Sequence, residues 1–386
     1  MFKDNSKLKN IFFLGFLLSL HLAFVSYISS SFLSTFSNEK YVSLIYVSGS
    51  ILSLFLLFIV PVVLKKIGEY KFLLLTSLLS IISLLLLSTL NTFWGIIPVF
   101  VFYFALNSLI VFALDELVQI YSKNSSMGHV RGLYLTVINL AWVVSQIISG
   151  RTLSAFSFST IYFVAFVIMS IFFIFVLFGL RKLNDPKYDN VLAWQSFKNF
   201  FTNKNLARAY KINFLLQFFY VWMVVYTPIY LYAHLGFDWK EIGIIFTVML
   251  LPFVFIQYPL GKYSDKIGER HLLMLGFFVT SLSTLSLFFI EKHEVLIWAL
   301  ALFCTRIGAA IVEVMSDVYF FKHIKKENDE FIAVYRNTSP VAYVVAPVVA
   351  FGVFYFVPSF NFIFLILGAL VSYGIYLAST IRKNDF

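Results

Sequence analysis

The stretch Gly261-Lys-Tyr-Ser-Asp265-Lys-Ile-Gly268-Glu-Arg270 is a short charged segment between two long apolar runs. It gathers two glycines, an aspartate and an arginine in a chain where charged residues are scarce. A shorter copy lies 200 positions earlier, where Lys66-Ile67-Gly68-Glu69 repeats Lys266-Ile267-Gly268-Glu269. The repetition predicts two related hinges, one in each half of the chain.

The composition around this stretch is that of a membrane protein. Of 386 residues, 60% are hydrophobic and 12% are charged, and the mean hydropathy is +0.88. A soluble domain needs about a quarter of its residues charged, so we infer that lipid is the solvent. The single cysteine, Cys304, excludes an internal disulfide and a cysteine-based metal site. It lies in an apolar run, and we expect it to be a small, buried packing residue.

Apolar runs on both sides of the hinges predict an all-α membrane protein with twelve transmembrane helices. The runs are continuous and not alternating, which favours helices over a barrel, and each approaches the roughly 20 residues that cross a bilayer. No small-residue cleavage site follows the first run, so we expect a retained helix and not a signal peptide. The predicted spans are 11–34, 42–64, 72–90, 93–121, 132–150, 158–181, 207–234, 241–261, 271–290, 295–321, 331–356 and 360–381.

The distribution of basic residues predicts the orientation. With twelve crossings and both termini cytoplasmic, 23 of the 29 Lys and Arg residues fall in inner segments and four in outer loops. This asymmetry is the positive-inside pattern of a multi-pass protein of the cytoplasmic (inner) membrane. The net charge of +10 therefore follows from topology and does not indicate nucleic-acid binding. We expect a monomer in the lipid bilayer.

The longest polar interruption predicts two domains. Residues 183–206 form a cytoplasmic linker in which Trp194, Phe197 and Phe201 follow helical spacing, as in an amphipathic helix on a membrane surface. The linker separates an N-terminal six-helix bundle, 1–182, from a C-terminal six-helix bundle, 207–386. Two parallel copies of six helices are a known plan of secondary transporters.

The hinge resembles the loop signature of the major facilitator superfamily (MFS), at Gly261, Asp265, Gly268 and Arg270. The first-half copy departs from it, because Pro61, Lys65 and Tyr70 replace the Gly, Asp and Arg. The resemblance implies two pseudo-symmetric bundles and a latch on the cytoplasmic side, and the alternative is an ordinary basic loop with turn glycines. The residues predicted for this cytoplasmic gate are Gly261, Asp265, Gly268, Arg270, Asp317, Arg336, Lys65, Lys66 and Gly68.

The predicted tenth helix carries several charged residues on one face. Arg306, Glu313 and Asp317 are spaced seven and four apart, so they form one stripe. In a structural interpretation, Asp317 pairs with Arg270 and Glu313 pairs with Arg336, as a charge lock. In a functional interpretation, Glu313 titrates a proton and Arg306 holds an anionic or polar group of a substrate. We favour the lock for Asp317 and substrate binding for Arg306. The sequence Arg306-Ile-Gly308-Ala-Ala310 also resembles an arginine motif that the family usually carries in its fourth helix.

Other polar residues in apolar runs are further candidates for substrate binding or proton coupling. His21, in the first helix, could titrate or could be neutral and bonded to a backbone carbonyl. Gln217 and Tyr220, in the seventh helix, could line a cavity or simply pack. Asp115, beside Glu116 in the fourth helix, could contribute a corresponding gate with Lys65 or Lys66.

These patterns predict transport and not catalysis. The histidines have no metal-ligand spacing and there is no phosphate-binding loop, so we expect no metal, no cofactor and no enzyme activity. We predict a secondary active transporter that moves a small solute by alternating access, with protons as the coupling ion. The alternatives are an uncoupled facilitator or exchanger of a small polar or anionic metabolite, and a non-transporting membrane enzyme or receptor.

Overall fold

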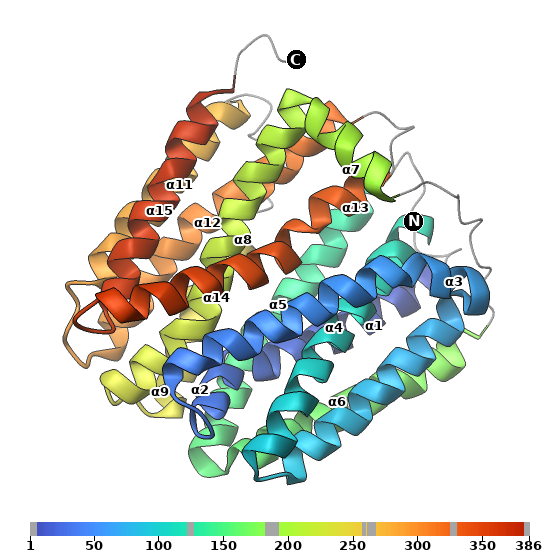
Figure 1. Cartoon of the computed structure of the whole chain (residues 1–386), viewed down its shortest axis with the longest axis horizontal. Helices are drawn as coiled ribbons and strands as arrows, with labels where there is room; N and C mark the ends of the chain where they lie inside the picture. Colours follow the sequence, from blue (N-terminus) through green and yellow to red (C-terminus); the bar gives the residue numbers. More distant parts are fainter. Residues whose placement is uncertain are drawn as a thin grey trace. The chain divides into compact units, whose positions relative to one another are not determined.

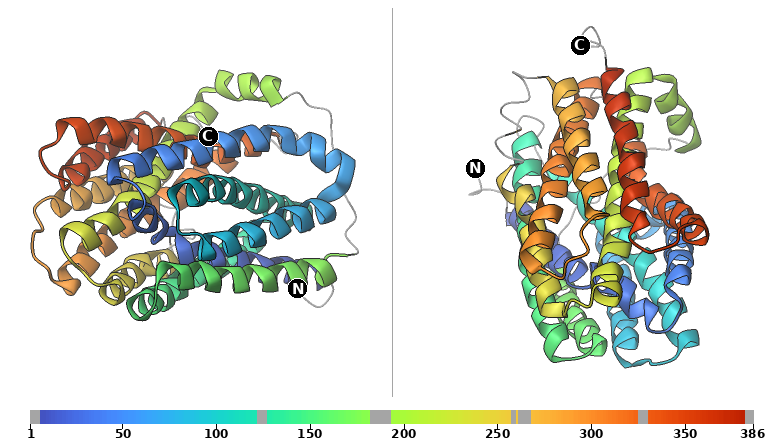
Figure 2. Two further views of the ribbon diagram at one scale, coloured as in Figure 1. Left: turned by 60° about the horizontal axis from the view of Figure 1, so that its bottom comes forward. Right: turned by 90° about the vertical axis from the view of Figure 1, so that its left-hand side faces the viewer.

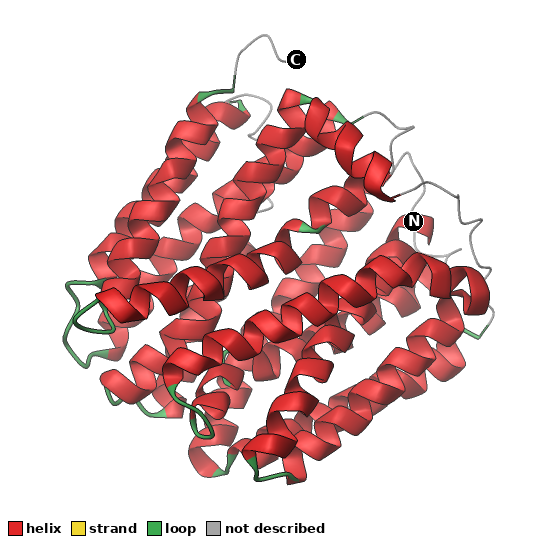
Figure 3. Cartoon of the chain, viewed as in Figure 1, coloured by secondary structure: helices red, strands yellow, loops and turns green. Residues whose placement is uncertain are grey.

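The computed structural model describes residues 6–121, 127–181, 193–256, 260, 268–324 and 330–381. Within these ranges, every regular element is a helix and none is a strand (Figure 3). The predicted all-α class is therefore confirmed. The hinge residues Gly261 and Asp265 lie outside the described ranges.

Nine helices of the described ranges are long and apolar enough to cross a membrane. Three further predicted spans coincide with helices that do not meet this criterion. They are the first arm of α3, whose apolar stretch Tyr41–Leu57 is short, and the helices α5 (Met127–Ala155) and α9 (Trp239–Phe255). The chain is thus a multi-pass membrane protein. Its large exposed side chains are apolar in keeping with a lipid environment, as with Phe178 and Phe356.

Hydroxyl side chains inside these helices bond to the helices' own backbone. Ser50 donates to the carbonyl of Tyr46 at 2.7 Å, and Thr76 to that of Phe72 at 2.8 Å. Each bond spans four residues, the usual way in which a serine or threonine satisfies its hydroxyl in a helix. A hydroxyl bonded in this way adds no unpaired group to a lipid-embedded helix.

The helices group into two compact units. The first unit contains Met1–Tyr188 and Asp238–Gly243. Within it, α3 packs along α4 and α6, and α1 packs along α4, α5 and α6. Besides α5, its helices are α1 (Ser6–Ser26), α2 (Ser29–Ser34), α3 (Glu39–Thr89), α4 (Phe93–Tyr121) and α6 (Phe158–Gly179).

The second unit contains Asp189–Phe237 and Ile244–Phe386. Within it, α11 packs along α12 and α15, and α8 packs along α12, α14 and α15 (Figure 2, right). Besides the rest of α9, its helices are α7 (Ala193–Thr202), α8 (Lys204–Ile229), the π-helical turn η2 (Tyr230–His234), α11 (Glu269–Leu287), α12 (Val295–His323), α13 (Glu330–Arg336), α14 (Thr338–Phe356) and α15 (Phe362–Ser379).

The two copies of the hinge share a backbone conformation. Figure 1 shows α3 as two arms that meet at a sharp bend, where Gly68 has φ 76° and ψ 164°. Gly268, which precedes α11, has φ 83° and ψ 142°. Glycine adopts positive φ at little cost, so both copies need this residue for the bend. In both copies the following glutamate is buried, Glu69 at 1% and Glu269 at 2% exposure.

A pair of glycines brings α11 and α12 into close contact. A β-carbon placed on Gly308 would lie 2.5 Å from the carbonyl oxygen of Gly276. Small residues allow membrane helices to approach in this way. Cys304, four residues before Gly308, is exposed, so our expectation of a buried cysteine was wrong.

The polar linker contains the short helix α7. Its Phe200 is fully buried, with ring centroids 5.6 Å from Phe331 and 6.3 Å from Phe320. Phe201 and Lys198, by contrast, are exposed. One face of α7 is therefore anchored on the second unit and the other is open. That the open face lies on the cytoplasmic leaflet stays a prediction.

Candidate functional site

The charged stripe on α12 begins with a buried arginine. Arg306 is 1% exposed. The centre of its guanidinium lies 5.0 Å from the ring centroid of Phe219 and 5.6 Å from that of Tyr220, both on α8. Contact of a cation with aromatic faces is attractive, and more so away from water. We call Arg306, Phe219, Tyr220 and Glu313 the arginine cluster.

Tyr220 also contacts the acid of this cluster. Its hydroxyl donates a hydrogen bond to Oε2 of Glu313 at 3.3 Å. One tyrosine therefore faces the cation with its ring and the carboxylate with its hydroxyl. Arg306 and Glu313 are seven residues apart on α12, which is about 10 Å along the helix axis. Gln217 is half-buried, one turn before Tyr220 on α8.

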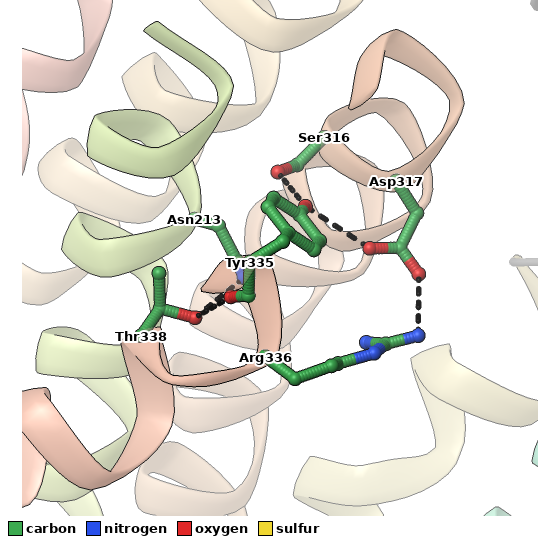
Figure 4. Close-up of polar contacts among 6 residues, drawn as sticks. All are labelled: Asn213, Ser316, Asp317, Tyr335, Arg336 and Thr338. Carbon is green, nitrogen blue, oxygen red and sulfur yellow. Dashed lines mark hydrogen bonds and ion pairs between the residues drawn. The ribbon is translucent and has the colours of Figure 1, made fainter. Parts of the chain in front are cut away.

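A second group of polar residues lies one turn further along α12 (Figure 4). Tyr335 donates to Oδ1 of Asp317 at 3.0 Å, and its hydroxyl is 2.7 Å from that of Ser316. Nη2 of Arg336 is 3.7 Å from Oδ2 of Asp317. We call Ser316, Asp317, Tyr335 and Arg336 the aspartate cluster. It links α12 to the short helix α13.

The aspartate cluster is tied to α8 through α14. Asn213 donates to the hydroxyl of Thr338 at 2.7 Å, and Thr338 donates to the carbonyl of Tyr335 at 2.9 Å. The ring of Tyr335 stacks on Phe320 with centroids 4.0 Å apart. Packing and hydrogen bonds therefore hold the tyrosine from both sides, which fixes the position of its hydroxyl beside Asp317.

The sequence predicted Arg270 as the partner of Asp317, and the structure instead pairs Asp317 with Arg336. The reason is that this segment forms two helices and not one: α13 ends at Arg336, and α14 begins at Thr338. We had placed Arg336 within one continuous helix, opposite Glu313. The break leaves Arg336 beside Asp317. Arg270 is half-buried, and its Nε has no hydrogen-bond partner among the described residues.

An ion pair that the sequence analysis missed lies next to the second hinge. Nζ of Lys322, at the end of α12, is 2.5 Å from Oε1 of Glu269. Glu269 follows Gly268 directly, and its carboxylate is almost fully buried. The repeated Gly-Glu pair, Gly68-Glu69 and Gly268-Glu269, was the available signal, since a buried acid at a bend needs a partner.

In the first unit, His21 lies in the interior. Its Nε2 is 2.7 Å from the hydroxyl of Tyr103 on α4, and the ring is fully buried. The contact joins α1 to α4. The structure thus gives His21 the side-chain partner Tyr103, besides the backbone of Leu18, a partner of the kind that we had considered.

The other first-unit candidates lie near the bend at Gly68. Asp115 and Glu116 are half-buried near the end of α4, whereas Lys65 and Lys66 are exposed on α3. The side chains of Glu116 and Glu69 form a hydrogen bond with each other. The acidic end of α4 therefore meets the buried glutamate of the hinge.

The arginine cluster can bind charged or polar groups within a membrane-spanning helix. It offers a cation, a hydrogen-bonding hydroxyl and a carboxylate within two turns of α12. Among the described residues, no group of three or more His, Cys, Asp or Glu side chains could hold a metal ion. A guanidinium, a phenol hydroxyl and a carboxylate can take part in ion pairing, hydrogen bonding and proton exchange.

Comparison with known proteins gives a family and a fold. Residues 215–384 match the family model of the Major Facilitator Superfamily. A solved POT family transporter in complex with a thioalcohol-conjugated peptide aligns with a TM-score of 0.75 and 14% identity, over 96% of this chain and 94% of that chain. The nucleoside transporter NupG aligns with a TM-score of 0.77 and 11% identity, over 98% and 100%.

The human organic anion transporter MFSD10 (TETRAN) also aligns, with a TM-score of 0.70 and 14% identity, over 97% of this chain and 99% of that chain. At these identities the solved structures show the fold alone. No curated protein matches the sequence.

Proposed function

Because the chain belongs to the major facilitator superfamily, we propose that it is a proton-coupled secondary transporter. In this proposal it moves a small solute across the cytoplasmic membrane and is not an enzyme. We propose twelve crossings in two six-helix bundles, 1–182 and 207–386, with both termini in the cytoplasm. The bundles expose a central site alternately to the two sides. The charge asymmetry of the loops supports the orientation.

The observation that carries the proposal is the carboxylate of Glu313 beside Tyr220 in a membrane-spanning helix. An ionisable group at this depth is costly and usually serves transport. We assign proton binding to Glu313. Its protonation removes one negative charge from the cluster, and the change in charge makes one state of the transporter more stable than the other.

We assign the cytoplasmic gate to the aspartate cluster and the hinges. In this assignment Asp317 and Arg336 close the second bundle, with Gly261, Asp265, Gly268 and Arg270 in the adjoining loop. Lys65, Lys66 and Gly68 form the corresponding loop of the first bundle, facing Asp115. The ion pair between Asp317 and Arg336 supports the assignment, because its exposed side chains can separate and re-form.

The test is flux in proteoliposomes with and without an imposed pH gradient, across a panel of solutes. We expect accumulation of one solute class with the gradient. Glu313→Gln should abolish gradient-driven accumulation and retain exchange of solute, since glutamine mimics only the protonated acid. Glu291→Gln, at an exposed acid, is the matched control. Flux without a response to pH would identify an uncoupled facilitator, and no flux for any solute would identify a receptor or enzyme.

A further inference from the structure

Arg306 has a donor that the fold leaves unused. Its Nη1 is buried and has no hydrogen-bond partner among the described residues. The guanidinium centre lies over two aromatic rings of α8, at 5.0 and 5.6 Å from their centroids, and these rings accept no conventional hydrogen bond. A buried N–H without an acceptor destabilises a protein, and a charged one does so more strongly.

A second arginine of the same unit shows that the fold can satisfy such a group. Arg208 donates from Nε to Thr380 at 3.0 Å. From Nη1 it donates to Asn205 at 2.8 Å and to Tyr319 at 2.9 Å. Its neutral partners come from three helices and fix it in place. Among the described residues, Arg306 has no comparable set of hydrogen-bond partners. A buried arginine with a purely structural role would be expected to have them.

The acid of the arginine cluster does not supply the missing acceptor. The hydroxyl of Tyr220 donates to Glu313 and its ring lies 5.6 Å from the guanidinium centre of Arg306, so this side chain contacts both charged groups. The buried Nη1 of Arg306 can therefore donate to an acceptor that a ligand supplies. The N–H groups of a guanidinium point outward in its plane, so a ligand that accepts hydrogen bonds from it must approach its edge.

We propose that the edge of Arg306 binds the carboxylate of a monoanionic substrate. The proposal rests on the function proposed above and specifies its substrate class. A planar carboxylate matches the planar donor edge of a guanidinium. One carboxylate neutralises the single charge of Arg306. A phosphate dianion would instead leave excess negative charge at membrane depth, near Glu313, where uncompensated charge is costly.

The experiment measures binding at equilibrium, in purified protein in detergent with no gradient. The probes are straight-chain and aromatic carboxylates of two to eight carbons, each paired with its primary amide and with the phosphate ester of the corresponding alcohol. Thermal unfolding is followed against probe concentration. We expect at least one carboxylate to raise the Tm, while its amide and phosphate partners leave it unchanged.

The variants locate the binding site. Arg306→Gln should weaken carboxylate binding about ten- to a hundred-fold, as expected for loss of hydrogen bonds to a charged group. Arg306→Lys retains the charge without the planar edge and should bind with intermediate affinity, which keeps the test valid if the glutamine variant fails to fold. Arg208→Gln, if monodisperse, should bind as the parent does.

Three results would overturn the proposal: no carboxylate that stabilises the parent, equal binding by Arg306→Gln, or Arg306-dependent binding of phosphate esters in preference to carboxylates. None of these results depends on flux. Carboxylate binding without transport would disprove the proposed function and leave this site standing. Transport of a solute without Arg306-dependent carboxylate binding would disprove this site and leave the proposed function standing.

Discussion

At the scale of single residues, Tyr220 couples a cation to an acid. Tyr220→Phe keeps the ring over Arg306 and removes the hydroxyl that donates to Glu313. A hydrogen bond to a charged group contributes about 1.5–3 kcal/mol. We therefore expect gradient-driven flux to fall about tenfold while carboxylate affinity changes less than threefold. Flux assays and thermal shifts on the same preparation measure both, and equal losses in the two would contradict the division of roles.

The ion pair of Glu269 and Lys322 should matter for stability more than that of Asp317 and Arg336. Glu269 is 2% exposed at its side chain, so Lys322→Met leaves a buried carboxylate without its cation, at a cost of about 3 kcal/mol. Arg336→Met breaks a pair that is 40% and 26% exposed, where about 0–1 kcal/mol is expected. Thermal unfolding of the two variants gives the ranking, and the reverse order would refute it.

The ion-pair partner of a residue was harder to predict from the sequence than the helix face on which the residue lies. The spacing of Arg306, Glu313 and Asp317 placed them on one face of a helix, because the helical period depends on sequence alone. The partner of Asp317 depends on where α13 ends, and the sequence Asn337-Thr338-Ser339-Pro340 marks that break with capping residues and a proline, a signal that the apolar run from 331 to 356 obscured. The exposure of Cys304 depends likewise on how α12 packs on α11, which its own sequence does not encode.

At the scale of elements, the two hinge glycines should be irreplaceable. Gly68→Ala and Gly268→Ala each place a β-carbon at positive φ, with an expected cost of about 1–2 kcal/mol. Gly352→Ala is the control: this glycine lies inside α14, and an added β-carbon would meet no atom within 4 Å. Alanine favours a helix there, so its Tm should hold or rise. If Gly352→Ala were as unstable as the hinge variants, the positive φ of the hinge glycines would not explain their loss of stability.

The helix α7 should depend on one side chain for its position. Phe200 is fully buried against Phe331 and Phe320, whereas Phe201 is 39% exposed. Phe200→Ala should destabilise the second unit by about 3 kcal/mol, and Phe201→Ala by clearly less. Limited proteolysis at the linker, compared between the two variants, reports the release of α7. The sequence predicted an amphipathic helix here, but not that its apolar face would pack on protein.

At the scale of the whole molecule, the sequence predicted the fold class well because lipid imposes a simple rule. Continuous apolar runs must become helices, so the runs and the helices of the described ranges largely coincide. The chain divides between Tyr188 and Asp189, within the polar interruption, and the two six-helix bundles stay a prediction. The number of crossings and the side on which each loop lies depend on the membrane itself, and they stay predictions.

Topology can be measured with single cysteines in a Cys304→Ser background. Lys198→Cys lies on α7, predicted to be cytoplasmic, and Lys292→Cys lies in a predicted outer loop, both exposed. An impermeant maleimide should label position 292 in intact cells and position 198 only after permeabilisation. Labelling in the opposite order would reverse the proposed orientation, and labelling of both in intact cells would contradict the odd number of crossings predicted between them.

The bend at Gly68 also bears on how the protein is made. A single non-helical residue joins the two arms of α3, so the arms are immediate neighbours in sequence and belong to the same unit. Contacts between such neighbours form early, because little chain entropy is lost in closing a short loop. As the chain leaves the ribosome, the two arms can enter the bilayer together as a helical hairpin. A substitution at Gly68 would then reduce the yield of inserted protein before it affects any transport step.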